Sequence, residues 1–232
     1  MPLRSAGLAR TALLLAGLLS ARGIACQDLV LRAEFWAESE PVEVLPAEIT
    51  DTAPKVTFPE EVARSLLEEG RRVFSGMIWG FEFRYVPYDK ARGAAEELEI
   101  LPLGEIPWGD PRLGTSQTRL TGTQLRAYLE YRPDPSAAAR KAAWDDATFQ
   151  SAQGRGSAPL AGGREARRTA LDQAAKEALR ELLRPVEKNK PGEIRGVFAY
   201  DASPRIVITG GSYTAVVRIR VKVAEVRRYS VY

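Results

Sequence analysis

The sequence contains no histidine and a single cysteine, Cys26. The absence of histidine excludes the Ser-His and Cys-His pairs that activate nucleophiles, and it excludes every histidine-containing metal site. A single cysteine excludes an internal disulfide, a thiolate metal cluster and a redox pair of cysteines. Carboxylate chemistry is the form of catalysis that the composition leaves open. We therefore expect no cofactor, no metal site and no catalytic residue.

Long apolar runs are also absent, except at the N-terminus. Two arginines precede the apolar stretch 11–21, and the small-x-small sequence Gly-Ile-Ala ends at residue 25. This order is typical of a secretory signal peptide, and the apolar stretch is too short to form a permanent membrane helix. We expect residues 1–25 to be removed and the protein to be exported into a bacterial envelope.

Of all single residues, Cys26 is the one whose sequence context points most directly to a function. The sequence Gly-Ile-Ala-Cys resembles a lipobox, in which the cysteine becomes the acylated first residue of the mature chain. It departs from that pattern at Gly23, where leucine is usual, and at Arg22, which interrupts the apolar run. Ordinary signal-peptidase cleavage after Ala25 or Gly23 fits equally well. The sequence is thus compatible with two alternatives, a soluble periplasmic protein and an outer-membrane lipoprotein.

The charges of the mature chain balance. The whole chain has 33 basic and 30 acidic residues, and the signal segment holds three of the arginines and no acid. Cleavage therefore leaves a net charge of zero, so the basic isoelectric point gives no support for nucleic-acid binding. The charges are unevenly distributed, because residues 163–232 contain 15 basic and 8 acidic side chains.

The strongest helical pattern covers residues 163–184. Alanines recur every fourth residue from Ala166 and join leucines on one face, while Arg167 and other charged residues occupy the opposite face. Small residues on successive turns predict a close approach between this helix and a sheet. We expect a pair of glycines to open the helix and Pro185 to end it.

Other segments show strand and helix patterns in an order that suggests alternating layers. Strand patterns occupy 28–36, 77–87, 95–101, 121–131, 194–200, 205–209 and a long stretch after Gly210-Gly211. Further helix patterns occupy 57–74, which begins with a capping box at Thr57 and Glu60, and 136–150, which Ser136 can cap. Residues 89–98 can also begin as a helix. A surface loop is expected at 101–114, and a flexible linker at 151–163.

This order predicts an α+β fold, with two to three helices packed on one side of a mainly antiparallel sheet of five to seven strands. One sheet and two sheets both fit. We expect a signal peptide at 1–25, an extended proline-rich segment at 26–56 and an α+β body at 57–232. A sub-division of the body near 133–162 is an option.

The long C-terminal strand carries the candidate partner-binding residues. Alternation places its valines and Ile219 inward and its cations outward. The candidates are Arg218, Arg220 and Lys222, with Arg227 and Arg228 beyond them. These cations either prevent an exposed strand from pairing with other chains, or they form a surface for an acidic partner or anionic headgroups. Carboxylates facing them on a neighbouring strand would favour the first interpretation.

The C-terminal third resembles a known group of envelope domains. The sequence Gly154-Arg155-Gly156, the regularly spaced alanines and the final VVRIRVKV resemble bacterial lipoprotein-20-type domains and flagellar outer-ring accessory domains. The resemblance is compositional and does not extend to residues 26–135. It implies a non-catalytic envelope protein in which a helix packs on a small sheet.

We therefore expect a non-catalytic module that binds another envelope protein or an anionic envelope component, with membrane contact only through an N-terminal lipid. The alternative is a carboxylate-dependent envelope hydrolase, which needs two acids facing each other across a cleft. The candidate acids are Glu60, Glu61, Glu68, Glu69, Glu96, Glu97, Glu99, Asp145 and Asp146. A small outer-membrane barrel needs about eight alternating segments of about ten residues each, more than this pattern contains.

Overall fold

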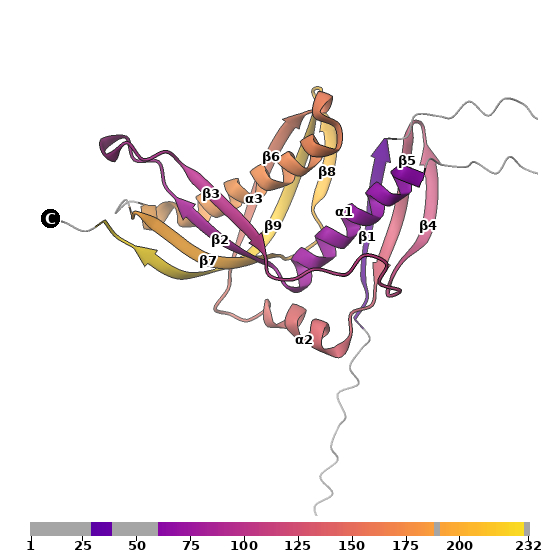
Figure 1. Ribbon diagram of the computed structural model, residues 1–232, viewed down its shortest axis with the longest axis horizontal. Helices are drawn as coiled ribbons and strands as arrows, with labels where there is room; N and C mark the ends of the chain where they lie inside the picture. The colour runs from indigo at the N-terminus through magenta and orange to yellow at the C-terminus, as the bar shows by residue number, and fades with distance from the viewer. Residues whose placement is uncertain (1–28, 39–59, 188–190, 230–232) are drawn as a thin grey trace, which may run out of the picture.

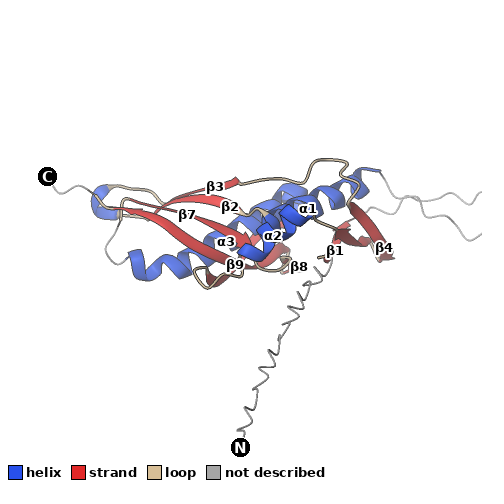
Figure 2. Cartoon of the chain, turned by 90° about the horizontal axis from the view of Figure 1, so that it is seen from below, coloured by secondary structure: helices blue, strands red, loops and turns tan. Residues whose placement is uncertain are grey.

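A computed structural model describes residues 29–38, 60–187 and 191–229. These residues form nine strands in two antiparallel sheets, together with three α-helices. The two sheets lie side by side along the long axis of the molecule (Figures 1 and 2). The predicted α+β class is confirmed, and there are two sheets. Cys26 and the predicted signal peptide lie outside the described residues.

The small sheet has three strands, and α1 (Glu60–Ile78) packs on it. Its order is β1 (Leu31–Glu38), β5 (Gln124–Tyr131) and β4 (Leu113–Thr121). Phe35 of β1 meets Phe74 of α1 edge-on, with 5.7 Å between the ring centroids. The strand predicted at 121–131 forms from Gln124 onward, and its four alternating side chains are buried: Leu125, Ala127, Leu129 and Tyr131.

The strand β4 was not foreseen by the sequence pattern, which predicted one strand at 121–131. A tight turn with Gly122 at φ 59° joins β4 to β5 and makes a hairpin. Apart from Leu113, every side chain of β4 is exposed. No apolar alternation therefore marks this strand, and only its pairing with β5 reveals it.

The large sheet has six strands, centred on the long strand β9 (Ser212–Arg227). The order is β3 (Glu97–Pro102), β2 (Phe81–Val86), β7 (Glu193–Tyr200), β9 and β6 (Gln150–Pro159), and β8 (Arg205–Thr209) also pairs with β9. β7 and β8 pair with successive parts of β9. The predicted hairpin between β8 and β9 is confirmed, because Gly210 and Gly211 both have positive φ angles.

The predicted flexible linker at 151–163 is wrong, because this segment forms β6. Gly154 and Gly156 of β6 lie directly against Ala174 and Ala178 of α3 (Gly163–Glu187). A Cβ atom on Gly154 would overlap the Ala174 carbonyl oxygen and the Ala178 nitrogen. The glycines are therefore needed for close contact between backbones and do not make a loose tether. The predicted close approach of the alanine face to a sheet is confirmed.

The ends of two helices differ from the prediction. Pro185 does not stop α3, which continues to Glu187. Proline this near the end of a helix removes a single hydrogen bond of the last turn, so the helix tolerates it. α2 (Pro135–Ala143) is shorter than predicted, and Asp134 caps it in place of Ser136 by accepting a 2.9 Å hydrogen bond from the Ala137 N–H.

The strand predicted at 77–87 begins later, because α1 extends to Ile78. Gly80, at φ 74°, makes the turn from α1 into β2. The Trp144 ring and the Phe198 carbonyl oxygen occupy the space where a Cβ atom of Gly80 would lie. The aromatic residues of β2 are buried as predicted. The helix option for 89–98 is wrong, since only a three-residue 3₁₀ turn forms there before β3.

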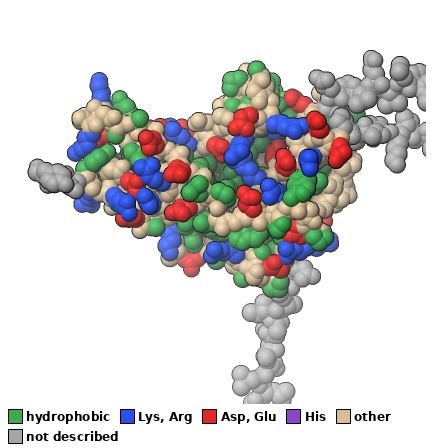
Figure 3. Space-filling model, in the orientation of Figure 1, with side chains coloured by type: hydrophobic (Ala, Val, Ile, Leu, Met, Phe, Trp, Pro, Cys, Tyr) green, Lys and Arg blue, Asp and Glu red, His purple; other side chains and the backbone are tan. Residues whose placement is uncertain are grey.

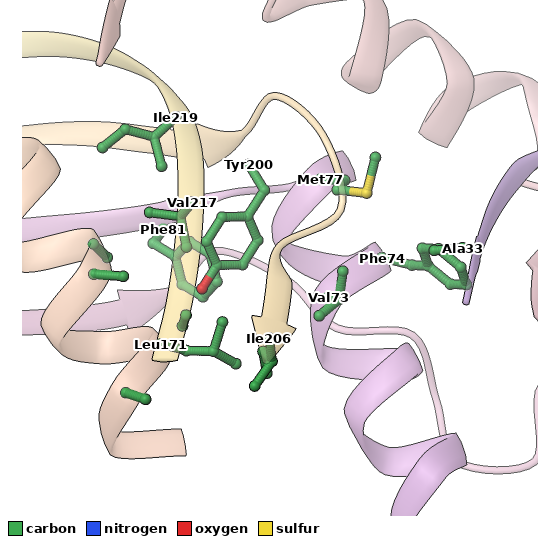
Figure 4. Close-up of a cluster of buried hydrophobic side chains, with 14 of the residues drawn as sticks. Ala33, Val73, Phe74, Met77, Phe81, Leu171, Tyr200, Ile206, Val217 and Ile219 are labelled. Atoms are coloured by element: carbon green, nitrogen blue, oxygen red, sulfur yellow. The ribbon is translucent and has the colours of Figure 1, made fainter. Parts of the chain in front are cut away.

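The core continues from one sheet to the other. Figure 4 shows Val73 of α1, Leu171 of α3 and Ile206 of β8 around Tyr200. The Trp36 indole N–H of β1 donates a 3.1 Å hydrogen bond to the Ile206 carbonyl oxygen, which ties the two sheets together. No described helix is long and apolar enough to cross a membrane.

Candidate ligand-binding cleft

A cleft of about 780 Å³ lies between α1 and α3. α3 packs on β6 and β9, so part of the inner face of β2, β3 and β7 stays open and forms the floor of the cleft. Acidic and basic side chains surround a hollow on the face seen in Figure 3. Pockets that bind small ligands typically measure roughly 300 to 1,000 Å³. The cleft is therefore the candidate binding site within the described ranges.

Three aromatic rings form the centre of the floor. The rings of Phe81 and Phe198 stack with 5.0 Å between centroids, and Tyr200 meets Phe81 edge-on at 5.3 Å. Burial raises the pKa of Tyr200 to about 12, so its hydroxyl stays neutral at physiological pH. Leu98 and Ile100 of the edge strand β3 extend the apolar lining. The floor is thus suited to an apolar group.

The walls of the cleft carry paired charges that join α1 to α3. Arg72 Nη2 of α1 lies 2.8 Å from Asp172 Oδ1 of α3. Burial raises the pKa of Asp172, and the charge of Arg72 opposes this rise. Arg71 binds the Ile106 carbonyl oxygen at 3.0 Å and the Glu105 carboxylate at 3.3 Å. The rim therefore offers both signs of charge around an apolar floor.

Arg167 was predicted on the exposed side of α3, but its side chain is 9% exposed. Its guanidinium binds both carboxylate oxygens of Glu69, with a shortest distance of 2.9 Å. It also lies over the rings of Trp36 and Tyr213, with 4.2 Å and 5.4 Å to the ring centroids. Helical periodicity alone puts a charged residue outward. Trp36 of β1, Tyr213 of β9 and Glu69 of α1 cover this position of α3 and make it a buried one.

The acids near the cleft are held by arginines and lysines. Glu96, just before β3, accepts hydrogen bonds from Arg180 at 2.6 Å and Tyr85 at 3.0 Å, and it lies 2.9 Å from Lys176 Nζ. Burial opposes ionisation of Glu96, but these partners outweigh it and lower its pKa to about 2. Together with Glu69, this acid is one of the candidate acids that the sequence analysis considered for a hydrolase. Its pairing with a distant helix carries no local sequence signal.

The predicted cationic candidates are divided into two groups along β9. Arg218 and Arg220 share the carboxylate of Asp201, at 2.5 Å and 3.2 Å. Lys222 lies 5.7 Å from the ring centroid of Phe149. The alternation predicted for this strand is confirmed, because Val217, Ile219 and Val221 are buried.

The second group of cationic candidates lies at the end of β9. Arg227 forms ion pairs with Glu225 at 2.8 Å and with Glu193 at 3.4 Å. Arg228 follows the last residue of β9 and is exposed. A stretch of four residues separates Lys222 from Arg227, so the five candidates do not form one compact cluster.

Comparison with other proteins places this chain in a family. A protein-family model matches residues 21–229. The chain belongs to that family. A protein of Treponema pallidum (strain Nichols), described as an uncharacterized protein, is 28% identical over 198 residues, which cover 85% of this chain and 81% of the relative. No solved structure matches the chain. These matches name no activity, so the argument for function depends on the site.

The family match includes every described residue, and it also includes Cys26. The cleft, the paired charges on its walls and the cationic residues of β9 all lie within the region that defines the family. Of the cleft residues, the sequence analysis singled out Glu68 and Glu69 among its candidate acids, and it did not predict that they line a cleft. The cleft residues come from α1, α3 and three strands, and only the fold brings them together.

Proposed function

We propose that this family member is an exported bacterial envelope protein that binds a ligand in the cleft without catalysing a reaction. The observation that carries the proposal is the cleft itself, an apolar aromatic floor between two helices whose facing charges are paired. Pockets of this kind bind a ligand through an apolar body and fix its orientation with a few polar groups. A short apolar segment of another envelope protein, with charged neighbours, has this chemistry.

A probe with an aromatic body and one negative charge tests the cleft. We expect anilinonaphthalene sulfonate to bind the purified protein and to fluoresce, because it matches the floor and the arginines of the rim. Gln173 is exposed at the lining of the cleft. Gln173→Trp should fill the opening and weaken binding of the probe, measured by fluorescence titration.

The matched control is Gln117→Trp, which makes the same change at an exposed position of β4. This control should bind the probe as the parent does. Equal affinities for the parent and Gln173→Trp would show that the probe does not enter the cleft. This result would contradict the proposal that the cleft is the binding site.

Export is supported by the basic start, the apolar stretch and the small residues before Cys26. If Cys26 is acylated, the parent should incorporate labelled palmitate and sediment with membranes. Cys26→Ser should incorporate none and appear in the soluble envelope fraction, because a stable anchor needs the two or three chains of a lipoprotein. A parent protein without label that is soluble in the periplasm would indicate ordinary signal cleavage.

A hydrolase remains the alternative because the carboxyl group of Asp172 has a raised pKa and lies in the cleft. A general acid needs such a shift. The other acids of the cleft that form ion pairs, Glu69 and Glu105, are bound by arginines, which suits structural contact better than proton transfer. Release of reducing ends from envelope glycans by the parent, and none by Asp172→Asn, would favour the hydrolase.

A further inference from the structure

The large sheet has a second candidate surface on the face that points away from α3. Gly154 and Gly156 of β6 face α3, so the side chain between them, Arg155, points to the other face. Arg155 pairs with Val216 of β9, and on the opposite side of β9 Arg205 of β8 pairs with the same valine. The two arginines therefore flank β9, with backbones about 10 Å apart because adjacent strands are about 4.8 Å apart.

Three cations of β9 continue the same face. Arg218, Arg220 and Lys222 follow Val216 at two-residue spacing, and the buried residues between them face α3. We call the five residues that share this side of the sheet the cationic face: Arg155, Arg205, Arg218, Arg220 and Lys222. The sequence pattern did not reveal this set, because Arg155 was assigned to a linker.

Acids balance only part of the positive charge on this face. Asp146 lies close enough to Lys222 for that cation to help lower the pKa of its carboxyl group. Asp201 is shared by Arg218 and Arg220. Arg155 and Arg205 form no ion pair with any residue that the structure describes. The strand positions beside Arg218 and Arg220 on β6 are Gln153 and Ser151, which are neutral. A row of facing carboxylates, which would explain the cations as a neutralised surface, is therefore missing from β6.

The cationic face is open to solvent. Arg155, Arg205, Arg218 and Lys222 are exposed, and α3 covers the other side of β6 and β9 (Figure 1). Half-buried Val207 and Val216 lie among these arginines. Like charges this close repel one another in the free protein, and a partner that supplies negative charge removes the repulsion.

We propose that the cationic face docks this protein on the surface of an anionic phospholipid bilayer. Four of the five cations are arginines, and a guanidinium binds phosphate oxygens in a planar, two-pronged contact. A bilayer surface offers phosphates across the whole width of three strands, with room for the valines at the headgroup boundary. Binding of this kind is independent of the cleft, and it weakens as salt rises.

The test is flotation of the full chain with vesicles, with Cys26→Ser in every variant so that no lipid anchor contributes. We expect binding to vesicles that contain phosphatidylglycerol and none to pure phosphatidylcholine. Arg155→Gln combined with Arg205→Gln should weaken binding by more than about tenfold, since each cation near an anionic surface contributes roughly fivefold. Raising the salt concentration should release the parent.

Two further variants separate docking from folding and from net charge. The matched control, Arg119→Gln with Arg132→Gln, removes two exposed cations beside the small sheet and should bind nearly as the parent does. Asp201→Asn removes the acid that Arg218 and Arg220 share and should bind several-fold more tightly, which loss of stability cannot imitate.

Three results of the flotation assay, and a fourth from a soluble polyanion, would overturn the proposal. The first is equal binding to neutral and anionic vesicles. The second is an equal loss for the double variant and its control, which would mean that only net charge matters. The third is unchanged or weaker binding of Asp201→Asn. Binding to a soluble polyanion without any binding to anionic vesicles would assign the face to a different partner and would also refute docking on lipid.

Discussion

The small and the large sheet differ in what lies between the sheet and its helix. Between β6 and α3 there are glycines and alanines, so the two backbones are in direct contact. Between the small sheet and α1 there are bulky side chains, such as Phe35 and Phe74, which meet edge-on. The first contact is sensitive to any added atom, whereas the second depends on large groups and is sensitive to their removal.

The difference also bears on the cleft. Because α3 packs on β6 and β9, the inner faces of β7, β2 and β3 are left to line the cleft, and their rings Phe81, Phe198 and Tyr200 are buried at its base. The end of α1 packs on this floor, because Gly76 lies against the rings of Phe81 and Tyr200, whereas the rest of α1 packs on the small sheet. The space between the helices is thus a consequence of two helices that pack on different sheets by different means.

Removal of a bulky group from the small sheet should have the largest effect. Phe74 is fully buried, and we expect Phe74→Ala to lower the free energy of unfolding by about 3 to 5 kcal/mol through loss of burial and a cavity. Chemical denaturation measures the loss. Hydrogen exchange should show larger losses of protection in β5 than in β9. Equal losses in both strands would show that the two sheets unfold as one unit.

The second largest effect on stability is expected where Arg167 of α3 contacts Glu69 of α1 and Trp36 of β1. Arg167→Met removes the guanidinium that binds Glu69 and covers Trp36. Breaking a buried ion pair while one partner stays costs roughly 3 kcal/mol or more, and Glu69 is the partner left behind. Thermal denaturation is the measurement. A second change, Glu69→Leu, should recover part of the loss, and a double variant no better than Arg167→Met would contradict this account.

A larger side chain at an alanine of α3 tests the close contact between α3 and β6 of the large sheet. Ala174→Leu should cost about 1 to 3 kcal/mol, because the added atoms meet the backbone of β6 and cannot move aside. The control is Ala139→Leu, the same change at an exposed position of α2, and it should change little because alanine and leucine have similar helix propensities. If both variants melt at the parent's temperature, the close contact of α3 is absent in solution.

The smallest effect is expected at the edge of the large sheet, where Glu96 ties β3 to α3. Its pKa is lowered from 4.5 to about 2, so its contribution is complete above pH 4.5 and is lost as the pH falls toward 2. The pair is partly exposed, and we expect no more than about 1 kcal/mol. Stability measured from pH 6 to pH 2 should fall less in Glu96→Gln than in the parent. Glu99→Gln is the exposed control, and a parent-like slope for Glu96→Gln would refute the assignment.

The features that depend on local periodicity could be predicted from the amino-acid sequence alone. The alanine stripe of α3 and the alternation of β5 and β9 each repeat with the period of one helix face or one strand face. The turn at Gly210-Gly211 also needs only its own backbone angles. Each of these features involves residues that are close together in the sequence, so the local pattern of residue types is enough to predict it.

The tertiary structure decided everything that depends on a partner far away in the chain. Gly154 and Gly156 have the composition of a linker, but pairing with β9 makes them part of a strand, and the close approach of α3 leaves no room for a side chain there. Arg167 has the position of a solvated residue, but β1 and β9 supply the aromatic rings that cover it. Periodicity reports which side of an element is apolar. It does not report which distant segment will pack against the polar side. The packing of distant segments is what forms both the cleft and the cationic face.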